Sequence, residues 1–392
     1  MKRIKNFLLN INGKTLNLSS NNINSDVIMN AIISKDAALS ILQGEQKVSN
    51  DTLMGIKNDY SDLVTYSKNI FLPLTRLCRN KCGYCTFRKE PKGPHNIMGK
   101  EEILSLVRSG QRNKCHEALF TFGERAETYS VACEELDSYG YGSMAEYIYD
   151  ISMEIMETSD LLVHTNAGLL RRSELRLLRE ANASMGLMLE SSSERLMEKE
   201  AHKNSPGKEP RLRLEMMRNA GKMKIPFTTG VLIGIGETDL EIYQSLLDIR
   251  KMADRHGNIQ EIIIQNFVPK NNSPMEGFQP PSLEKIMSVI SLARMMFPDI
   301  SIQLPPNLNR KNLMELMGLG VDDLGGVSPI TPDHVNPESP WPVKMIEKLG
   351  LVERLPVYPK FISKEFLSEI VYKKAIGLVS DDGFVRREEN YD

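Results

Sequence analysis

The sequence predicts an α/β fold, a (β/α) barrel that is complete or partial. Eight short apolar runs are separated by longer amphipathic segments. The runs are continuous rather than alternating, as in parallel strands buried on both faces. Strands that alternate with helices in this way are typical of a barrel. The runs are Ile70–Leu74, Ala118–Phe122, Leu161–His164, Met185–Leu189, Phe227–Ile233, Glu261–Phe267, Ile300–Leu304 and Asp323–Val327.

Before the barrel, residues 1–65 are expected to form a helical extension. Asp26–Leu42 and Asn50–Tyr66 carry apolar residues at helical spacing, with Ser25 and Ser49 as N-cap candidates. A serine in that position accepts a hydrogen bond from the first turn, so each helix is expected to begin just after it.

We place the barrel core at residues 66–330 and a Pro-rich loop with a C-terminal extension, including helices, at 331–392. Within the core, Thr238 begins a capping box and Ser282 follows a proline, so both mark helix starts. The Pro/Gly-rich stretch 325–342 is either a lid or substrate wall beside the barrel mouth, or a surface linker.

Composition excludes several classes of protein. The chain is 41% hydrophobic and 26% charged, with a net charge of −2 and no basic stripe, so we expect no nucleic-acid partner. It has no apolar run of about 18 residues, so we expect no membrane span. The apolar stretch Phe7–Leu9 is too short for a signal peptide. Five cysteines argue against a disulfide framework and favour a reducing, cytoplasmic location.

Polar and small residues gather where the predicted strands end, which is where barrel enzymes carry their chemistry. Polar turn residues after any strand would give a similar pattern. His164 ends the third strand and is a candidate base or hydrogen-bond donor, or else a structural histidine. Arg211, Arg213 and Arg218 share a predicted helix with Glu215, which is typical of a solvated face.

Three cysteines follow the first strand in the pattern Cys78-x3-Cys82-x2-Cys85. Thiolates are soft ligands that favour iron–sulfur clusters or zinc. Three thiolates leave one iron of a [4Fe-4S] cluster open, which suits a catalytic cluster. A structural zinc needs a fourth ligand, and the sequence has no second paired motif to supply it. We therefore favour a cluster over zinc, and both over three unreactive core cysteines.

With Tyr84 before the last cysteine, this motif resembles the signature of the radical S-adenosylmethionine (SAM) superfamily. The family fold is a TIM-like (β/α) barrel, and its cofactors are a [4Fe-4S] cluster and SAM. The resemblance implies that the three cysteines bind the cluster and that SAM binds its open iron. It also implies SAM contacts from residues near the strand ends: Tyr84, Gly123, Glu124, Asn166, Glu190, Gly234, Gln265, Phe267 and Val268. Among these, Glu190 is also a candidate catalytic residue, together with His164.

Longer blocks resemble FO synthase subunit 1, the CofG type, over residues 60 to 360. They include TFGERAE, LLVHTNAGLL, TTGVLIGIGET and VSPITPDHVNPESPWP. FO is 7,8-didemethyl-8-hydroxy-5-deazariboflavin, a precursor of a deazaflavin coenzyme. The resemblance implies a carbon–nitrogen lyase that acts on the 4-hydroxybenzyl adduct of 5-amino-6-(ribitylamino)uracil. The adduct loses hydrogen to a 5′-deoxyadenosyl radical and cyclises with release of ammonia, while SAM yields methionine and 5′-deoxyadenosine.

The same resemblance implies a CofH-type second subunit or enzyme that makes the adduct, and reduced flavodoxin or ferredoxin as the electron donor. Two alternatives stay open. The chain could be a CofH-type tyrosine-dependent transferase or another radical SAM enzyme of cofactor biosynthesis. It could also be an iron–sulfur electron carrier or a zinc-stabilised binding protein without catalysis.

Overall fold

The computed structural model describes residues 8–11, 14–17 and 33–386. The N-terminal part contains a hairpin that the sequence did not predict, with β1 (Leu8–Ile11) antiparallel to β2 (Lys14–Asn17). Two helices follow, α2 (Lys35–Leu42) with Ser34 as its N-cap and α3 (Asn50–Tyr60) with the predicted N-cap Ser49.

The predicted helix Asn50–Tyr66 is too long, because Thr65 already begins the first barrel strand. Of the predicted helix Asp26–Leu42, residues 26–32 lie outside the described residues. The described part forms α2 from Lys35 onward, with the Ser34 side chain accepting the N-terminal hydrogen bond from Ala37. The proposed cap Ser25 lies outside the described residues.

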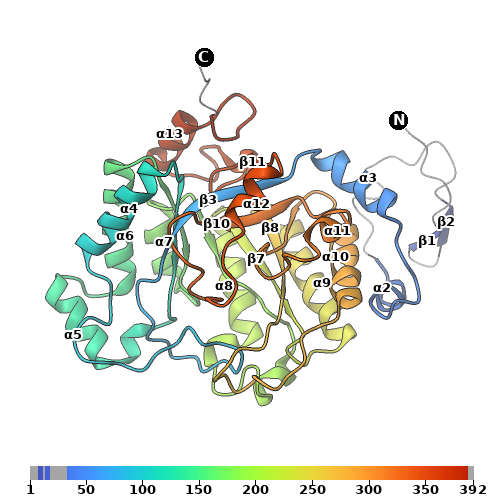
Figure 1. Cartoon of the computed structure of the whole chain (residues 1–392), viewed down its shortest axis with the longest axis horizontal. Coiled ribbons are helices and arrows are strands. Elements are labelled where there is room, and N and C mark those ends of the chain that lie inside the picture. The colour runs from blue at the N-terminus through green and yellow to red at the C-terminus, as the bar shows by residue number, and fades with distance from the viewer. Residues whose placement is uncertain (1–7, 12–13, 18–32, 387–392) are drawn as a thin grey trace.

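Eight parallel strands of the described chain close into a barrel, as predicted. They are hydrogen-bonded in chain order, and β10 also pairs with β3, which closes the sheet. Figure 1 shows helices wrapped around these strands. The strands are β3 (Thr65–Leu72), β4 (Glu117–Thr121), β5 (Leu162–Asn166), β6 (Ser184–Gly186), β7 (Phe227–Ile233), β8 (Ile259–Asn266), β9 (Ser301–Gln303) and β10 (Asp323–Val327).

Helices alternate with the strands, and their starts follow local capping chemistry. The predicted capping box is present, since Thr238 accepts from the Glu241 amide and Glu241 accepts from the Thr238 amide. Ser282 caps the next helix by accepting from the Lys285 amide. No helix of the described residues is long and apolar enough to cross a membrane. The helices are α4 (Lys100–Arg112), α5 (Ser130–Tyr139), α6 (Met144–Thr158), α7 (Arg172–Arg179), α8 (Pro210–Lys222), α9 (Asp239–His256), α10 (Leu283–Met296) and α11 (Leu313–Met317).

The apolar core lies between the strands and these helices. Strand residues that face outward, such as Ile70, Phe120 and Ile262, are completely buried against the helices. Burying a side chain of this size contributes about 1.5–3 kcal/mol. Residues that face into the lower half of the barrel are largely polar instead, and the C-terminal extension supplies their partners.

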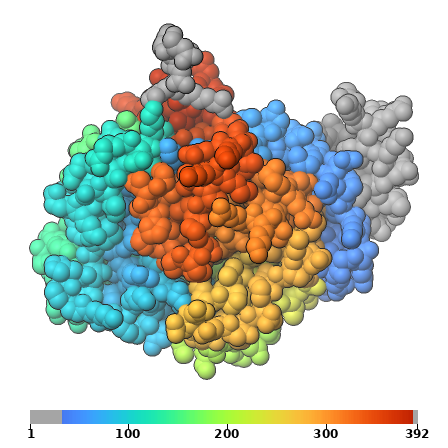
Figure 2. Space-filling model, in the orientation of Figure 1, coloured from blue at the N-terminus to red at the C-terminus, as the bar shows by residue number. Residues whose placement is uncertain are grey.

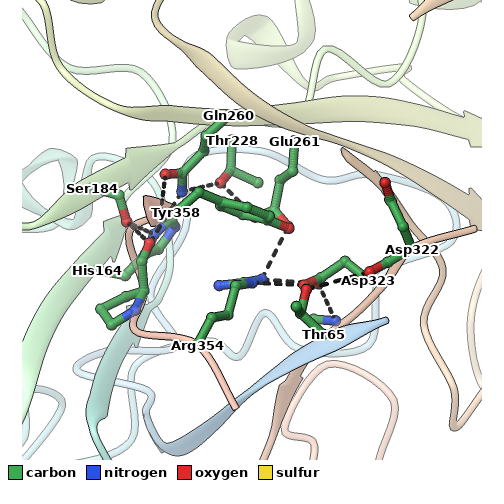
Figure 3. A network of polar contacts seen from close by, with 12 residues as sticks. Thr65, His164, Ser184, Thr228, Gln260, Glu261, Asp322, Asp323, Arg354 and Tyr358 are labelled. Atoms are coloured by element: carbon green, nitrogen blue, oxygen red, sulfur yellow. Dashed lines mark hydrogen bonds and ion pairs between the residues drawn. The ribbon is translucent and has the colours of Figure 1, made fainter. Parts of the chain in front are cut away.

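At its base, the barrel is closed by Arg354. The short strand β11 (Val352–Glu353) pairs with the first residues of β3, and Arg354 follows it into the barrel. Its guanidinium donates to both carboxylate oxygens of Asp323, at 2.6 and 2.9 Å, and to Glu261 at 3.1 Å. Thr65 also donates to Asp323, and Tyr358 to Glu261. Figure 3 shows Arg354 between the two carboxylates.

His164 belongs to the other side of this network. Ser184 donates its hydroxyl proton to the carbonyl of Pro356, so the 2.7 Å contact between His164 Nδ1 and Ser184 Oγ needs a proton on Nδ1. Burial lowers the pKa of His164 to about 3, helped by Arg354, so the ring is neutral and its Nε2 is an acceptor. The C-terminal extension contains two helices in its described part, α12 (Val343–Lys348) and α13 (Glu369–Leu378).

Candidate active site

The three-cysteine loop lies at the carboxyl end of β3, the mouth of the barrel. The backbone around it is tightly held. The Cys78 carbonyl accepts from Arg88 and from the Tyr129 hydroxyl, and the Glu124 amide points at Cys78 Sγ at 3.3 Å. A Cβ on Gly123 would lie 1.9 Å from the Leu77 carbonyl oxygen, so only glycine fits there.

The loop presents free thiols, and the protein alone does not stabilise Cys78 and Cys82 as thiolates. None of the three forms a disulfide. Burial raises the pKa of Cys78 to about 11 and also raises that of Cys82, with the neighbouring Cys85 adding to the effect. A metal centre would supply the missing positive charge, since coordination deprotonates a thiol. The donor set therefore fits an iron–sulfur cluster.

Within the described residues, no group of three or more His, Cys, Asp or Glu side chains is arranged around a single point to hold one metal ion. A cubane cluster does not require this, because each protein thiolate binds its own iron atom.

A cavity of about 240 Å³ opens beside the cysteines. It brings together nearly all the predicted site residues, although they come from five different strand ends. Those that line it are Cys78, Cys82, Tyr84, Cys85, Gly123, Glu124, Asn166, Glu190, Gln265, Phe267 and Val268. Residues far apart in the sequence thus meet at one edge of the barrel, as expected for the carboxyl ends of parallel strands.

Glu190 enters the cavity in a strained backbone conformation. Its φ is 64°, in the left-handed region that non-glycine residues rarely adopt. Its carboxylate accepts from Lys208 Nζ at 2.6 Å, and both side chains are largely buried. Burial acts to lower the pKa of Lys208, but Glu190 outweighs it and the pKa is raised, so the ammonium is retained. Strain of this kind persists where a side chain must be aimed at a ligand.

The Glu124 carboxylate is held by several polar donors at the edge of the cavity. It accepts from Arg79 at 2.7 Å and from the Leu169 amide at 3.0 Å, and Arg213 lies 3.9 Å away. Burial opposes ionisation, but Arg213 and these donors lower the pKa of Glu124, which stays ionised. The carboxylate therefore joins the cysteine loop, through Arg79, to the loop after β5, through Leu169.

The Pro-rich stretch forms a wall of the cavity, not a surface linker. Val335 and Asn336 line the cavity, and Lys270 donates to the Val335 carbonyl at 2.5 Å. Asp333 is buried and accepts from both the Val335 and Asn336 amides. Figure 2 shows the orange and red C-terminal segments spread over the centre of this face.

Two predicted site residues lie elsewhere. Gly234 does not line the cavity, because its amide is held by Glu237 Oε1 at 2.6 Å and a Cβ there would meet Pro281. Its positive φ of 92° explains the glycine as a turn residue. His164 lies in the base network, so its placement favours the structural alternative.

Sequence reasoning missed several cavity residues. The prediction that Arg213 lies on a solvated face is wrong: it is 3% exposed and donates to the carbonyls of Met188 and Gly207. The pattern of α8 could not show this, because the buried acceptors belong to other loops. Further lining residues without a sequence signal are Asn80, Thr121, Met188, Lys208, Lys270 and Asn336.

Comparison with known proteins agrees with this geometry. Residues 72–249 match the sequence profile of the Radical SAM superfamily, whose enzymes use a [4Fe-4S] cluster and SAM. The barrel with its three-cysteine mouth is therefore that of a radical SAM enzyme.

Within that class, the chain belongs to the family of 7,8-didemethyl-8-hydroxy-5-deazariboflavin synthases. It is 50% identical to the synthase of Methanocaldococcus jannaschii over 354 residues, covering 88% of this chain and 98% of the relative. It is 53% identical to that of Methanothermobacter thermautotrophicus over 318 residues, covering 79% and 96%.

Solved structures share the fold. Methylornithine synthase (PylB) superposes with a TM-score of 0.62 at 18% identity, covering 79% of this chain and 87% of that one. The FeFe-hydrogenase maturase HydG from Carboxydothermus hydrogenoformans gives 0.65 at 19% identity, covering 84% and 79%. At these identities the likeness concerns the barrel alone.

Proposed function

We propose that this chain forms FO from the 4-hydroxybenzyl adduct of 5-amino-6-(ribitylamino)uracil, as a carbon–nitrogen lyase that releases ammonia, methionine and 5′-deoxyadenosine. The observation that carries the proposal is the meeting of three free thiols with the Glu190–Lys208 pair in one cavity. The kinship with synthases of this name supports the choice of product.

In this proposal Cys78, Cys82 and Cys85 hold the [4Fe-4S] cluster and leave one iron for SAM. Together the two cofactors supply hydrogen-atom abstraction. The SAM contacts are those predicted residues that line the cavity: Tyr84, Gly123, Glu124, Asn166, Glu190, Gln265, Phe267 and Val268.

The chain's own contribution is to position the reactants and exclude water. The Tyr84 ring packs edge-on against His202, with 5.8 Å between ring centroids, and its hydroxyl lies 3.3 Å from His202 Nε2. Phe267 and Leu232 add apolar surface. A largely apolar site of this kind limits the access of stray hydrogen donors to a reactive species and holds the substrate in contact.

Two partners follow from the reaction. A CofH-type enzyme would supply the adduct, because nothing in the proposed step joins tyrosine-derived carbon to the uracil. Reduced flavodoxin or ferredoxin would supply the electron, because the cluster must be reduced before each turnover.

The test is an anaerobic assay of the reconstituted enzyme with dithionite, SAM and the synthetic adduct. We expect FO, seen by its fluorescence, with 5′-deoxyadenosine and ammonia. Turnover of free tyrosine without FO from the adduct would instead identify a CofH-type transferase. Absence of 5′-deoxyadenosine under all these conditions would overturn both enzyme assignments and leave an electron carrier or binding protein.

A further inference from the structure

Four cations of the described chain line the cavity, and Lys270 differs from the other three. Arg88, Lys208 and Arg213 each lie close to a glutamate carboxylate, at 2.5, 2.6 and 3.9 Å. No ion pair of the described residues includes Lys270, whose Nζ donates to the Val335 carbonyl at 2.5 Å. This bond uses one of the three donors of an ammonium. Two donors are therefore left for a ligand.

Two segments of the barrel mouth hold Lys270 in place. It lies on the loop after β8, which also brings Phe267 and Val268 to the cavity, and it is 8% exposed. Its bond to Val335 joins this loop to the Pro-rich wall. The ammonium is therefore held at this junction, within reach of a substrate that occupies the cavity beside SAM.

The other titratable groups of the cavity are committed to other contacts. The carboxylate of Glu124 is ionised and held by its own donors. Burial raises the pKa of Tyr84 well above its usual value, and its hydroxyl lies against His202 Nε2. Lys208 is paired with Glu190, which raises its pKa despite burial. The two arginines do not release protons, and the three cysteines are the proposed cluster ligands.

For Lys270, burial outweighs the neighbouring charges. It lowers the pKa of the ammonium, against the opposing effects of Glu338, Cys85 and Asp333. A buried ammonium of this kind gives up its proton more readily than an exposed lysine does. Among the groups that line the cavity, Lys270 is therefore the one best able to deliver a proton.

The release of ammonia needs a proton donor. When the bond from carbon to the departing nitrogen breaks, this nitrogen keeps the electron pair and takes up a proton to leave as ammonia. The substrate loses a proton from a neighbouring atom as a double bond forms, so the elimination involves no net oxidation or reduction. The proton lost by the substrate returns the donor to its ammonium form.

We propose that Lys270 is a catalytic residue that donates a proton from Nζ to the departing nitrogen of the substrate. This inference rests on the proposed function, because that function supplies a substrate that releases ammonia. It assigns the elimination to a different group from the cluster and SAM, which serve hydrogen-atom abstraction.

The first experiment is a single-turnover assay of the reconstituted enzyme with dithionite, SAM and the synthetic adduct. Lys270→Arg keeps the charge and a donor for the Val335 carbonyl, but a guanidinium does not release a proton. We expect ammonia and FO to form ~100-fold more slowly relative to 5′-deoxyadenosine than in the wild-type enzyme, because general acids contribute effects of this size. An unchanged ratio in Lys270→Arg would overturn the assignment.

The second experiment replaces the missing group by an added amine. In Lys270→Ala, methylammonium should speed FO formation by about tenfold, because it can enter the vacated space and donate a proton. Tetramethylammonium carries the same charge without a proton to give, so it should have no effect. Acceleration by both ions would mean that Lys270 acts through its charge alone, and acceleration by neither would likewise reject it as the donor.

Lys374→Arg is the matched control. Lys374 is also half-buried, burial lowers its pKa, and it donates to the carbonyls of Met156 and Ser159, but it does not line the cavity. The ratio of ammonia to 5′-deoxyadenosine should stay at the wild-type value in this variant. A loss in both lysine variants would assign the effect to general destabilisation and overturn the inference. No FO or ammonia from the wild-type enzyme would reject the proposed function itself, whereas FO from the wild-type enzyme and Lys270→Arg alike would reject only the role of Lys270.

Discussion

The mouth and the base of the barrel both bring charged groups into buried space, but they differ in what satisfies those charges. At the base, Arg354 is saturated by Asp323 and Glu261, and the carboxylates gain further donors from Thr65 and Tyr358. At the mouth, burial raises the pKa values of Cys78 and Cys82, and Lys208 offsets this only in part for Cys82. The base therefore satisfies its buried charges with its own residues, whereas the mouth needs a ligand to satisfy its buried groups.

The largest effect is expected at the mouth, from Cys82→Ala. Removing one buried cluster ligand should abolish bound iron and lower SAM cleavage by more than ~10³-fold, because the cofactor that carries the chemistry is lost. The thermal midpoint of the apoprotein should change little. Iron analysis and 5′-deoxyadenosine release measure this. Cys133→Ala, a half-buried thiol away from the cavity, should retain full iron; four irons per chain in Cys82→Ala would contradict the ligand assignment.

At the base, Arg354→Met should act on stability instead. It leaves two carboxylates buried without their counter-charge, which typically costs about 3–5 kcal/mol. Denaturant unfolding of the apoprotein measures the loss. Arg386→Met is the control, since that side chain is exposed and bonds only a carbonyl near the chain end. If both variants unfold at the same denaturant concentration, the base network is not what closes the barrel.

Substitution of Glu117, which lies between the mouth and the base, should change the free energy of unfolding in a pH-dependent way. Burial raises its folded pKa from 4.5 to about 7, so ionising it costs stability as the pH rises through this interval. Glu117→Gln should therefore raise the free energy of unfolding by about 3 kcal/mol at pH 8. The gain should shrink as the pH falls from 7 and disappear below about 4.5. A gain that does not vary with pH would mean that Glu117 is not the titrating group.

The smallest expected effect comes from the wall of the mouth. Asp333 Oδ2 accepts from the amide nitrogens of Asn307 and Asn336. In Asp333→Asn, the new NH2 group cannot accept a hydrogen bond. In one orientation it would face the two side-chain donors, and in the other it would face the Val335 and Asn336 backbone amides. We expect a cost of about 1–3 kcal/mol, a tenfold rise in KM for the adduct, and an unchanged rate of SAM cleavage without substrate. Asn312→Asp, elsewhere on the surface, should leave KM unchanged.

The barrel and most of the mouth could be predicted from the sequence because both follow local rules. Buried parallel strands leave continuous apolar runs, and the cysteine spacing is contained within eight residues. The strand ends then bring their polar residues together by topology. The two predicted residues that miss the cavity, His164 and Gly234, share the same pattern of polar and small residues near strand ends. His164 lies two residues before Asn166 on β5 and is therefore deeper in the barrel, and the Gly234 amide is bonded by Glu237.

The base could not be predicted, because its partners are brought together only by the closed barrel. Glu261, Asp323 and Arg354 lie on separate elements and carry no motif. The burial of Lys208 and Arg213 could not be predicted for a related reason. A lysine or arginine in a helical region is expected to be exposed to solvent unless its buried acceptors are known. Charged residues that pair over long sequence distances leave no periodic pattern in the sequence, so their pairing cannot be predicted from it.

The pairing of β11 with β3, next to the place where β10 also joins β3, sets an order of assembly during synthesis on the ribosome. All eight barrel strands emerge before Arg354 does, so a nascent chain holds Asp323 and Glu261 near one another with no guanidinium between them. Until Arg354 is released, the two carboxylates lack their counter-charge, and the edges of β3 and β10 can pair with other chains. Stalling before Arg354 emerges would therefore leave this protein more prone to aggregation than stalling after it.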